Sequence, residues 1–419
     1  MRAVLLLALK SAWARRLTLG ITLVSIALAS ALLLTVERVR HDARENFSQT
    51  ISGVDLVVGP RTGGVQLVLY AVFHSGAATH NMQWDSFDAL SHHPAIAWAV
   101  PIALGDSHHG FPVLGTTPNY FEHFQYADQQ TLQMSAGRVF GEVFETVLGN
   151  TVASELGYHV GDRITLAHGL TETGPSHADK PFTVMGILAP TGTPVDRTVH
   201  VSMEAITALH LDWTGGAPMP GFSIPAEHVK KFNLIPKEVT AMLIGLKSRS
   251  DVFRLQRHIN HYRGEPLMAV MPGVALDELW QTLASVENSL LIISVLVVLV
   301  GLAGLVATLL AALNERRREL AILRSLGASL GEIFLMLTTE GLMITVLGVT
   351  LGYVLFAVGM EILAPMVQTQ FGIHLHWRIL TVNEIILLLS IIVTGFLVSL
   401  IPGWRAWRMS LADGLTPRI

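Results

Sequence analysis

Four long apolar stretches without a charged side chain constrain the fold of this chain more than any other feature. They run from Leu17 to Val36, Asn288 to Asn314, Gly341 to Met360 and Ile385 to Trp404, which gives 20, 27, 20 and 20 residues. A helix rises about 1.5 Å per residue, so each stretch is long enough to cross a hydrocarbon core of roughly 30 Å. The sequence therefore predicts a membrane protein with four spans.

Three groups of basic residues flank these spans, and all three fall on one side of a four-span arrangement. They precede the first span, separate the second from the third, and follow the fourth: Arg2, Lys10, Arg15 and Arg16; Arg316, Arg317, Arg318 and Arg324; Arg405, Arg408 and Arg418. Short loops rich in Lys and Arg stay in the cytoplasm. Both termini and the second-to-third loop are therefore predicted to be cytoplasmic, with the segment between the first two spans outside. We expect the first span to be retained, because its apolar run exceeds that of a signal peptide.

The outer segment differs from the rest of the chain in charge. Residues 41–282 hold 14 Lys and Arg against 23 Asp and Glu, while the remainder holds 14 against 9. An acidic outer domain argues against nucleic acid as a partner. The chain has no Cys, which excludes disulfides and thiolate chemistry.

Short strands and short helices are predicted to alternate in the outer segment, which indicates an α+β domain of two lobes. The β-branched runs predict strands at 54–58, 99–104, 113–116, 147–149, 182–188, 199–201 and 241–246. Helices are expected at 84–92, 151–156, 203–209 and 251–261, the last with Asp251 as its N-cap. Residues 190–194 and 213–221 are expected to be loops.

We divide the chain into nine segments on these patterns. They are a cytoplasmic amphipathic helix (1–16), the first span (17–40), the outer domain (41–274) with an inserted lobe at about 135–230, a stalk helix continuous with the second span (275–313), a cytosolic loop (314–330), the third span (331–364), a short outer loop (365–381), the fourth span (382–404) and a cytoplasmic tail (405–419). The early and late parts of the outer domain, roughly 41–130 and 235–275, are expected to pair.

No catalytic motif stands out. The glycine-rich run from Gly59 to Gly64 lacks the lysine of a phosphate-binding loop, so we interpret it as a turn. Zinc-protease and nucleophile motifs are absent as well. We therefore expect no enzyme activity, no catalytic residue and no cofactor in this chain.

The histidines are the residues of this chain that most suggest a metal or haem site, because imidazole is a common ligand of both. Sixteen of the 18 histidines lie in or at the edge of the outer segment, including the adjacent pairs His92-His93 and His108-His109. Adjacent side chains diverge on a strand or a helix, so neither pair forms a site by itself. We expect solvated surface histidines and assign no metal ligand.

The cytosolic loop has the pattern of an ordered helix. Glu315 and Glu319 stand four residues apart, Arg318 and Arg324 spread around them, Leu320 and Leu323 line another face, and Gly327 follows. A loop that only fixes topology would explain the charges. The apolar stripe and terminal glycine instead favour a helix that fits a groove in a second protein.

Small residues in the third span predict close helix packing. Gly348 and Gly352 are spaced four residues apart, and Gly341 lies on a neighbouring part of the helix. Glu340 precedes them near the cytoplasmic end, where an interfacial carboxylate or a subunit contact would explain it.

Three of these segments resemble the FtsX/MacB/LolC-type permeases of ABC transporters, also called type VII. The strongest resemblance is the run from Glu315 to Ala328; residues 8–16 and 402–412 resemble the beginning and the end of the membrane part. Residues 156–162 and 182–188 resemble parts of the outer domain less specifically. The one-plus-three arrangement of spans around a large outer domain is also similar.

The resemblance implies a permease in the cell inner membrane with its large domain in the periplasm. It implies a dimer with a second copy or a paralogue, lipid contact, and a separate ABC ATPase that binds ATP and Mg²⁺. Glu315, Arg318, Glu319, Leu323, Arg324 and Gly327 would then form the coupling helix on that ATPase. The ATPase would drive export or extraction of a substrate at the outer face by mechanotransmission.

The substrate stays open at this level. Efflux of haem or of a toxic small molecule is an alternative, and the many histidines are the reason to retain it. A non-transporting activator of a periplasmic or cell-wall enzyme is another. A periplasmic or membrane-fusion partner would be compatible with either hypothesis, efflux or export.

Overall fold

The computed structural model describes residues 16–50, 52–76, 78, 80–127, 129–169, 174–214, 217–219, 223–315, 317–325, 327–371 and 380–408. The expected amphipathic helix before Arg16, the tail after Arg408 and the outer-loop residues 372–379 lie outside this part. Contacts divide the described chain into a helical unit, from residues 16–42, 284–366 and 380–408, and a mixed unit, from residues 43–283 and 367–371.

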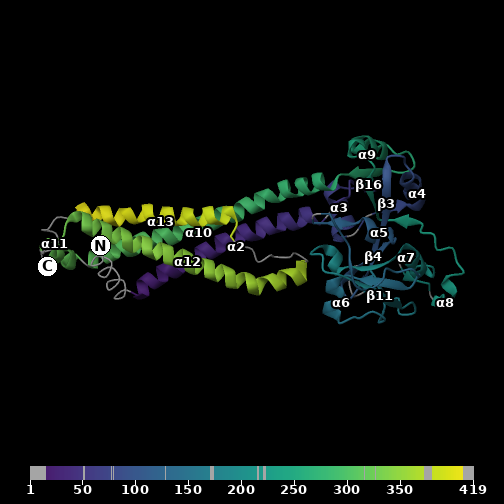
Figure 1. The fold of residues 1–419 in the computed structure, drawn as a ribbon, viewed down its shortest axis with the longest axis horizontal. Helices are drawn as coiled ribbons and strands as arrows, with labels where there is room; N and C mark the ends of the chain where they lie inside the picture. Colours follow the sequence, from purple (N-terminus) through teal and green to yellow (C-terminus); the bar gives the residue numbers. More distant parts are fainter. Residues whose placement is uncertain are drawn as a thin grey trace. The chain divides into compact units, whose positions relative to one another are not determined.

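Four long helices build the helical unit (Figure 1). They are α2 (Arg16–Gln49), α10 (Pro272–Glu315), α12 (Leu330–Phe371) and α13 (Val382–Arg408). Each contains a segment long and apolar enough to cross a membrane. At about 1.5 Å per residue, the 44 residues of α10 extend well beyond a hydrocarbon core of roughly 30 Å. The short helix α11 (Arg317–Ser325) lies between α10 and α12 in sequence.

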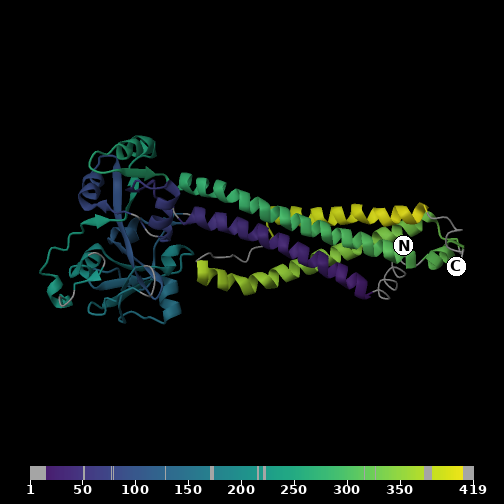
Figure 2. The same ribbon diagram turned by 180° about the vertical axis from the view of Figure 1, so that it is seen from behind.

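The helices share one apolar core to which all four contribute. Ile26 of α2, Leu305 of α10, Ile344 of α12 and Ile391 of α13 are buried in the same cluster. Thr22 and Thr308 add a hydrogen bond of 2.9 Å between α2 and α10. Figure 2 shows from behind how α2 crosses alongside α10 and α12. The four spans expected from sequence are therefore present as one packed bundle.

An 11-stranded sheet organises the mixed unit. Nine strands follow the order β17-β1-β16-β3-β4-β12-β8-β11-β7, with β10 beside β3 and β9 beside β11. Their bounds are β1 (Leu56–Pro60), β3 (Ile96–His108), β4 (Phe111–Thr116), β7 (Met134–Gly137), β8 (Glu145–Leu148), β9 (Arg163–Ile164), β10 (Ala167–His168), β11 (Phe182–Leu188), β12 (Val199–Ser202), β16 (Ala241–Leu246) and β17 (Leu267–Val270). All seven strands expected from the β-branched runs are confirmed, within a few residues at their ends.

Short helices and three small strand pairs complete this unit. The helices are α3 (Gly64–Phe73), α4 (Trp84–Ser91), α5 (Asn119–His123), α6 (Asn150–Leu156), α7 (Met203–Leu209), α8 (Ala226–Val229) and α9 (Val252–Asn260), with 3-10 turns η1 (Pro194–Arg197) and η2 (Arg249–Asp251). The pairs are β2 (Met82–Gln83) with β15 (Glu238–Val239), β5 (Gln125–Tyr126) with β6 (Gln130–Thr131), and β13 (Trp213–Thr214) with β14 (Ala217–Pro218).

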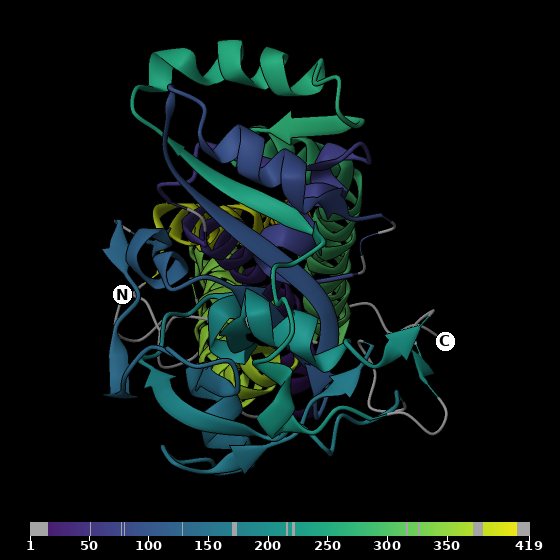
Figure 3. The same cartoon turned by 90° about the vertical axis from the view of Figure 1, so that its right-hand side faces the viewer.

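The early and late parts of the outer domain do pair, as expected. β16 joins β1 and β3, and β17 joins the other edge of β1, all antiparallel. Most of the segment at 135–230 forms the other half of the same sheet through β4 and β12. The 13-residue β3 runs through both halves of the sheet (Figure 3). It pairs with β16 in the first half and with β4 in the second, so one long strand connects the two lobes.

Three local expectations are wrong or incomplete. Asp251 precedes α9, but its side chain makes no capping hydrogen bond and pairs with Arg254 instead. Residues 213–218 were expected as loop, yet β13 and β14 form a small hairpin there. The sequence patterns also missed α3, which begins at Gly64, the last residue of the expected turn, while Gly59 and Pro60 of that turn belong to β1.

Candidate functional site

The cytosolic segment after α10 is helical and packs partly against its own bundle. Leu320 of α11 is buried with Leu313 of α10 and Leu337 of α12. The apolar stripe was expected to face a partner protein, and this is wrong for Leu320, because the bundle itself covers it. Ile322, which the sequence patterns did not single out, is instead 56% exposed.

The predicted coupling residues lie in this segment. Glu315 is exposed at the end of α10, and Arg324 is half-buried in the last turn of α11. Gly327 has a φ of +103°, a left-handed conformation that favours glycine, and its N–H donates to the Arg324 carbonyl at 3.0 Å. Arg318, Glu319 and Leu323 belong to α11, but their side chains lie outside the described part. Their role in ATPase contact stays a prediction.

The three glycines of the third span lie against other helices. A Cβ added at Gly348 would stand 2.8 Å from Ile26 Cγ2, and one at Gly352 would stand 2.6 Å from the Ala27 carbonyl oxygen, both in α2. A Cβ at Gly341 would stand 2.5 Å from Ser399 Cβ in α13. No larger residue fits there unless the helices separate. Glu340, beside them, is buried.

A buried ion pair links the first and the last span. Arg38 of α2 donates two hydrogen bonds to Glu384 of α13, at 2.6 and 2.8 Å. Glu384 also accepts from the Thr381 N–H at 2.7 Å, and its own N–H donates to the Thr381 hydroxyl, so it completes a capping box. Sequence reasoning missed this pair, because the partners are 346 residues apart.

The histidines of the mixed unit are not all on the surface. His74, His108, His177 and His200 are buried, which makes the expectation of solvated histidines wrong for these four. Burial lowers the pKa of His74 to about 4 and that of His200 to about 3. These rings are therefore neutral at pH 7, and His74 bonds Thr198 at 2.9 Å.

One group of histidines gathers around a buried carboxylate. A ligand atom from each of Asp106, His168, His177 and His210 lies within 4.8 Å of those of the other three. Asp106 Oδ1 is 3.1 Å from His168 Nδ1, 3.6 Å from His210 Nε2 and 3.9 Å from His177 Nε2. His168 Nδ1 is also 3.0 Å from His210 Nε2. We call these four residues the Asp106 cluster.

Backbone pairing brings the members of the Asp106 cluster together. Asp106 and His168 are direct partners across the antiparallel pair of β3 and β10. The His177 N–H donates to the Leu166 carbonyl at 2.8 Å, which holds His177 beside the same strand. His210 caps the C-terminus of α7. The register of β3 shifts between Leu104 and Asp106, an irregularity of the kind that often re-aims a side chain at a functional site.

The charge of Asp106 is maintained by its neighbours. Burial alone would raise its pKa, but the hydrogen bonds and charges of His168, His210 and His177 bring the pKa to about 2. Burial lowers the pKa of His177 to about 4, so this ring is neutral. Burial also lowers the pKa of His210, but Asp106 outweighs that effect and raises it overall.

A surface cavity gives access to the Asp106 cluster. Its volume is about 1070 Å³, and its lining includes Asp106, His168, His210 and Trp213. The Trp213 ring lies 4.4 Å from the His177 ring and 5.0 Å from the His168 ring, centroid to centroid. The cluster therefore has an aromatic wall on one side and a route from solvent on another.

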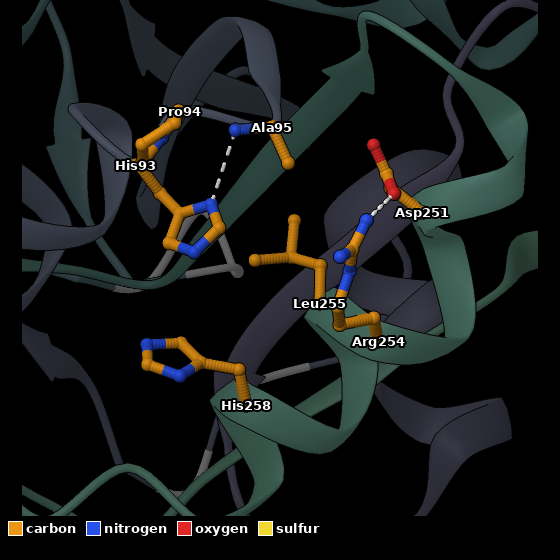
Figure 4. A pocket seen from close by; sticks show the side chains of 7 residues that line it. All are labelled: His93, Pro94, Ala95, Asp251, Arg254, Leu255 and His258. Carbon is orange, nitrogen blue, oxygen red and sulfur yellow. Dashed lines mark hydrogen bonds and ion pairs between the residues drawn. The ribbon is translucent and has the colours of Figure 1, made fainter.

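A second histidine pair lines a smaller pocket of about 430 Å³ beside α9. Figure 4 shows the rings of His93 and His258 facing each other, 5.2 Å apart, while Asp251 turns toward Arg254. His93 Nδ1 accepts from the Ala95 N–H at 3.2 Å. No carboxylate joins the two rings among the residues lining this pocket, so the pair offers a weaker site than the Asp106 cluster.

Two family models match the chain. Residues 17–261 match the MacB-like periplasmic core domain, and residues 291–411 match the FtsX-like permease C-terminal domain. The lipoprotein-releasing system transmembrane protein LolC of Xylella fastidiosa strain 9a5c is 22% identical over 377 residues, covering 84% of this chain and 85% of that protein. LolC of strain Temecula1 is 22% identical over 365 residues, with 81% and 82% covered.

Two solved structures have a similar outer part. The periplasmic region of MacB from Actinobacillus actinomycetemcomitans matches with a TM-score of 0.34 and 13% identity, covering 56% of this chain and 94% of that one. The extracellular domain of the noncanonic ABC-type transporter YknZ from Gram-positive bacteria matches with a TM-score of 0.29 and 13% identity, covering 52% and 98%.

Four membrane-crossing helices with an α+β domain between the first and the second define a membrane protein with a large extracytoplasmic domain. The MacB-like model alone covers more than half of the sequence, and the FtsX-like model covers the last three spans. The chain therefore belongs to the FtsX/MacB/LolC-type, or type VII, family of ABC transporter permeases. Members of this family work with ABC ATPases, and this chain is a permease component.

Proposed function

We propose that this permease transmits ATP-driven movement from a separate ATPase subunit to its own extracytoplasmic domain. The movement exports or extracts a substrate at the outer face of the inner membrane. The permease works as a dimer with a second copy or a paralogue, and ATP and Mg²⁺ bind to the partner ATPase.

The observation that carries this function is the continuity of α10. One residue separates the start of this helix from β17 of the sheet, and one residue separates its end at Glu315 from α11. It contains no proline after its first residue, Pro272. A helix without a break is a stiff element, so a displacement of its cytoplasmic end has a direct covalent route to the sheet.

The structure of α11 supports its use as the ATPase contact. Leu320 and Ala321 are buried against the bundle, which fixes the helix to the ends of α10 and α12. The opposite side leaves Ile322 and Ser325 exposed. The exposed apolar side chain of Ile322 in α11, with the exposed charge of Glu315 at the preceding end of α10, suits contact with a groove in a second protein. Ile322 is therefore added to the coupling residues predicted from the sequence.

The test is a double substitution at two exposed positions, Glu315→Arg at the end of α10 with Ile322→Asp in α11. Both side chains are exposed, so the permease should fold and insert normally. We expect the variant to lose copurification with the ABC ATPase and to lose stimulated ATP hydrolysis in lipid. The matched control is Phe253→Asp with Arg257→Glu, two exposed positions on α9 of the outer domain. Unchanged copurification and hydrolysis in the variant with Glu315→Arg and Ile322→Asp would overturn the proposal.

A further inference from the structure

We propose that Asp106, His168, His177 and His210 bind one divalent transition-metal ion, and that Zn²⁺ is the ion this donor set fits best. Such a site is independent of ATPase coupling, because it rests on the outer domain alone.

The spacing of the donor atoms matches a tetrahedral site. Zinc binds imidazole nitrogen and carboxylate oxygen at about 2.0–2.2 Å, so neighbouring ligand atoms of a tetrahedron stand roughly 3.3–3.6 Å apart. Four of the six distances among the donors of the Asp106 cluster are 3.0, 3.1, 3.6 and 3.9 Å, and all donor atoms lie within 4.8 Å of one another. Small shifts of these side chains would therefore place an ion at the centre.

The hydrogen bonding leaves lone pairs that point at one another. His210 Nδ1 lies 2.8 Å from the Ile206 carbonyl and must donate to it, so Nε2 is an acceptor whenever the ring carries a single proton. Asp106 Oδ1 is an acceptor too, and the two stand 3.6 Å apart. A proton on His168 Nδ1 can form a good hydrogen bond to only one of these two atoms, Asp106 Oδ1 or His210 Nε2. A cation between these atoms resolves the conflict.

His177 supplies the second independent observation. Its side chain is 1% exposed, and neither ring nitrogen has a hydrogen-bond partner among the described residues. A buried imidazole without a partner costs free energy, and proteins rarely retain one without a reason. A second proton on the His210 ring would make its contact with Asp106 favourable. It would still leave the buried His177 ring without a hydrogen-bond partner among the described residues. A metal ion uses the nitrogen of His177 that faces Asp106.

The surroundings hold the ligands in place. The four residues come from β3, β10, the segment paired with it, and the end of α7, each fixed by backbone hydrogen bonds. The bond from His210 Nδ1 to a backbone carbonyl is the usual way in which proteins orient a metal-binding imidazole. Trp213 covers the rings, and the adjoining cavity gives an ion a way in.

The ligand set selects the class of ion. Three imidazoles and one carboxylate suit zinc and its first-row neighbours, whereas Ca²⁺ and Mg²⁺ require more oxygen ligands. Four protein ligands leave no open position, so the ion stabilises the fold and does not catalyse a reaction. It would tie the end of α7 and residues 174–177 to the C-terminal end of β3.

Calorimetric titration of chelator-stripped, full-length permease in detergent with ZnCl₂ is the first measurement. We expect one Zn²⁺ per chain and no binding of Ca²⁺ or Mg²⁺. Loss of a residue that only hydrogen-bonds to a metal ligand lowers metal affinity roughly 10- to 100-fold. Asp106→Asn and His177→Gln each remove a ligand itself, so each should lower the Zn²⁺ association constant by more than that. The control, His93→Asn with His258→Asn, removes the other histidine pair and should bind Zn²⁺ as the wild type does.

A ligand exchange tests the site even if removal of a ligand harms folding. The chain has no Cys, so His177→Cys introduces the single thiol. A thiolate is a zinc ligand, and we expect the Co²⁺-loaded variant to show both tetrahedral d–d bands and a new sulfur-to-cobalt charge-transfer band. Failure of the wild type to bind Zn²⁺, wild-type affinity in Asp106→Asn and His177→Gln, or a His177→Cys variant that binds Co²⁺ without the sulfur band would each overturn the proposal.

Discussion

Arg38 and Glu384 form a bidentate, buried ion pair that joins the first helix of the bundle to the last. The two hydrogen bonds measure 2.6 and 2.8 Å, and both side chains are almost fully buried. The Arg38 guanidinium also lies over the Phe356 ring of α12, 5.6 Å from its centroid. One residue thus contacts two of the three C-terminal spans.

Removal of one partner of this pair should destabilise the bundle strongly. Arg38→Ala leaves the Glu384 carboxylate buried and unpaired, which costs about 3–5 kcal/mol. Thermal unfolding of the purified permease in detergent would show a clearly lower midpoint. Glu155→Ala breaks the more exposed pair with Arg197 and should cost at most about 1 kcal/mol. Equal effects of the two substitutions would contradict the structural role assigned to Arg38.

Gly352 should tolerate no side chain, because α2 lies directly against it. In Gly352→Ala the new Cβ would stand 2.6 Å from the Ala27 carbonyl oxygen, so the helices must separate at a cost of about 1–3 kcal/mol. Gly359 of the same helix has nothing within 4 Å of such a Cβ. Gly359→Ala should therefore be neutral or slightly stabilising in the same thermal assay. A neutral Gly352→Ala would remove this glycine from the helix-packing set.

The outer domain should lose stability as the pH falls from about 6.5 toward 4. Burial lowers the pKa of His74 to about 4, so the unfolded chain binds a proton in this interval that the folded chain does not. The loss from His74 alone is about 3 kcal/mol, at 1.36 kcal/mol for each pH unit.

His74→Asn removes this titration while keeping a side chain that tolerates the left-handed backbone at φ 50°. Hydrogen exchange of the strands in the full-length protein, followed from pH 7.5 to 5, should depend less on pH in the variant after correction for intrinsic rates. His92→Asn, at an exposed histidine, should leave the pH dependence as it is. If hydrogen exchange depends on pH equally in His74→Asn and in the wild type, His74 is not a source of the pH-dependent stability.

Gly327 should matter for coupling because its backbone conformation is left-handed. Gly327→Ala strains a residue at φ +103° and loosens the end of α11, by about 1 kcal/mol or more. We expect reduced ATPase stimulation at normal permease yield. Gly331→Ala, in the first turn of α12, has no atom closer than 4.0 Å to its new Cβ and serves as the control. Full stimulation in Gly327→Ala would argue against an ordered α11 at the ATPase.

The membrane part was the most predictable from sequence, because twenty uncharged residues have few alternatives to a span. The strands of the outer domain followed from their β-branched runs, and β16 did pair with β1 and β3. The hairpin at Trp213 was missed, since proline and glycine around it favoured a loop.

The Asp106 cluster could not be found from the sequence. Its members stand at positions 106, 168, 177 and 210, with no spacing that places two of them on one helical face or within one short motif. Only the pairing of β10 with β3 and the end of α7 bring them together. The Arg38–Glu384 pair was missed for the same reason, because both contacts depend on tertiary packing.

The most direct measurement is the ATP dependence of the distance between the outer domain and the membrane part. The chain has no Cys, so Arg163→Cys and Glu361→Cys provide two defined points for spin labels. In lipid with the ATPase present, we expect ATP binding to shift the distance distribution in the permease. The same labels should show no shift when Glu315→Arg and Ile322→Asp are added. An unchanged distribution in a complex that binds and hydrolyses ATP would contradict ATP-driven movement of the outer domain.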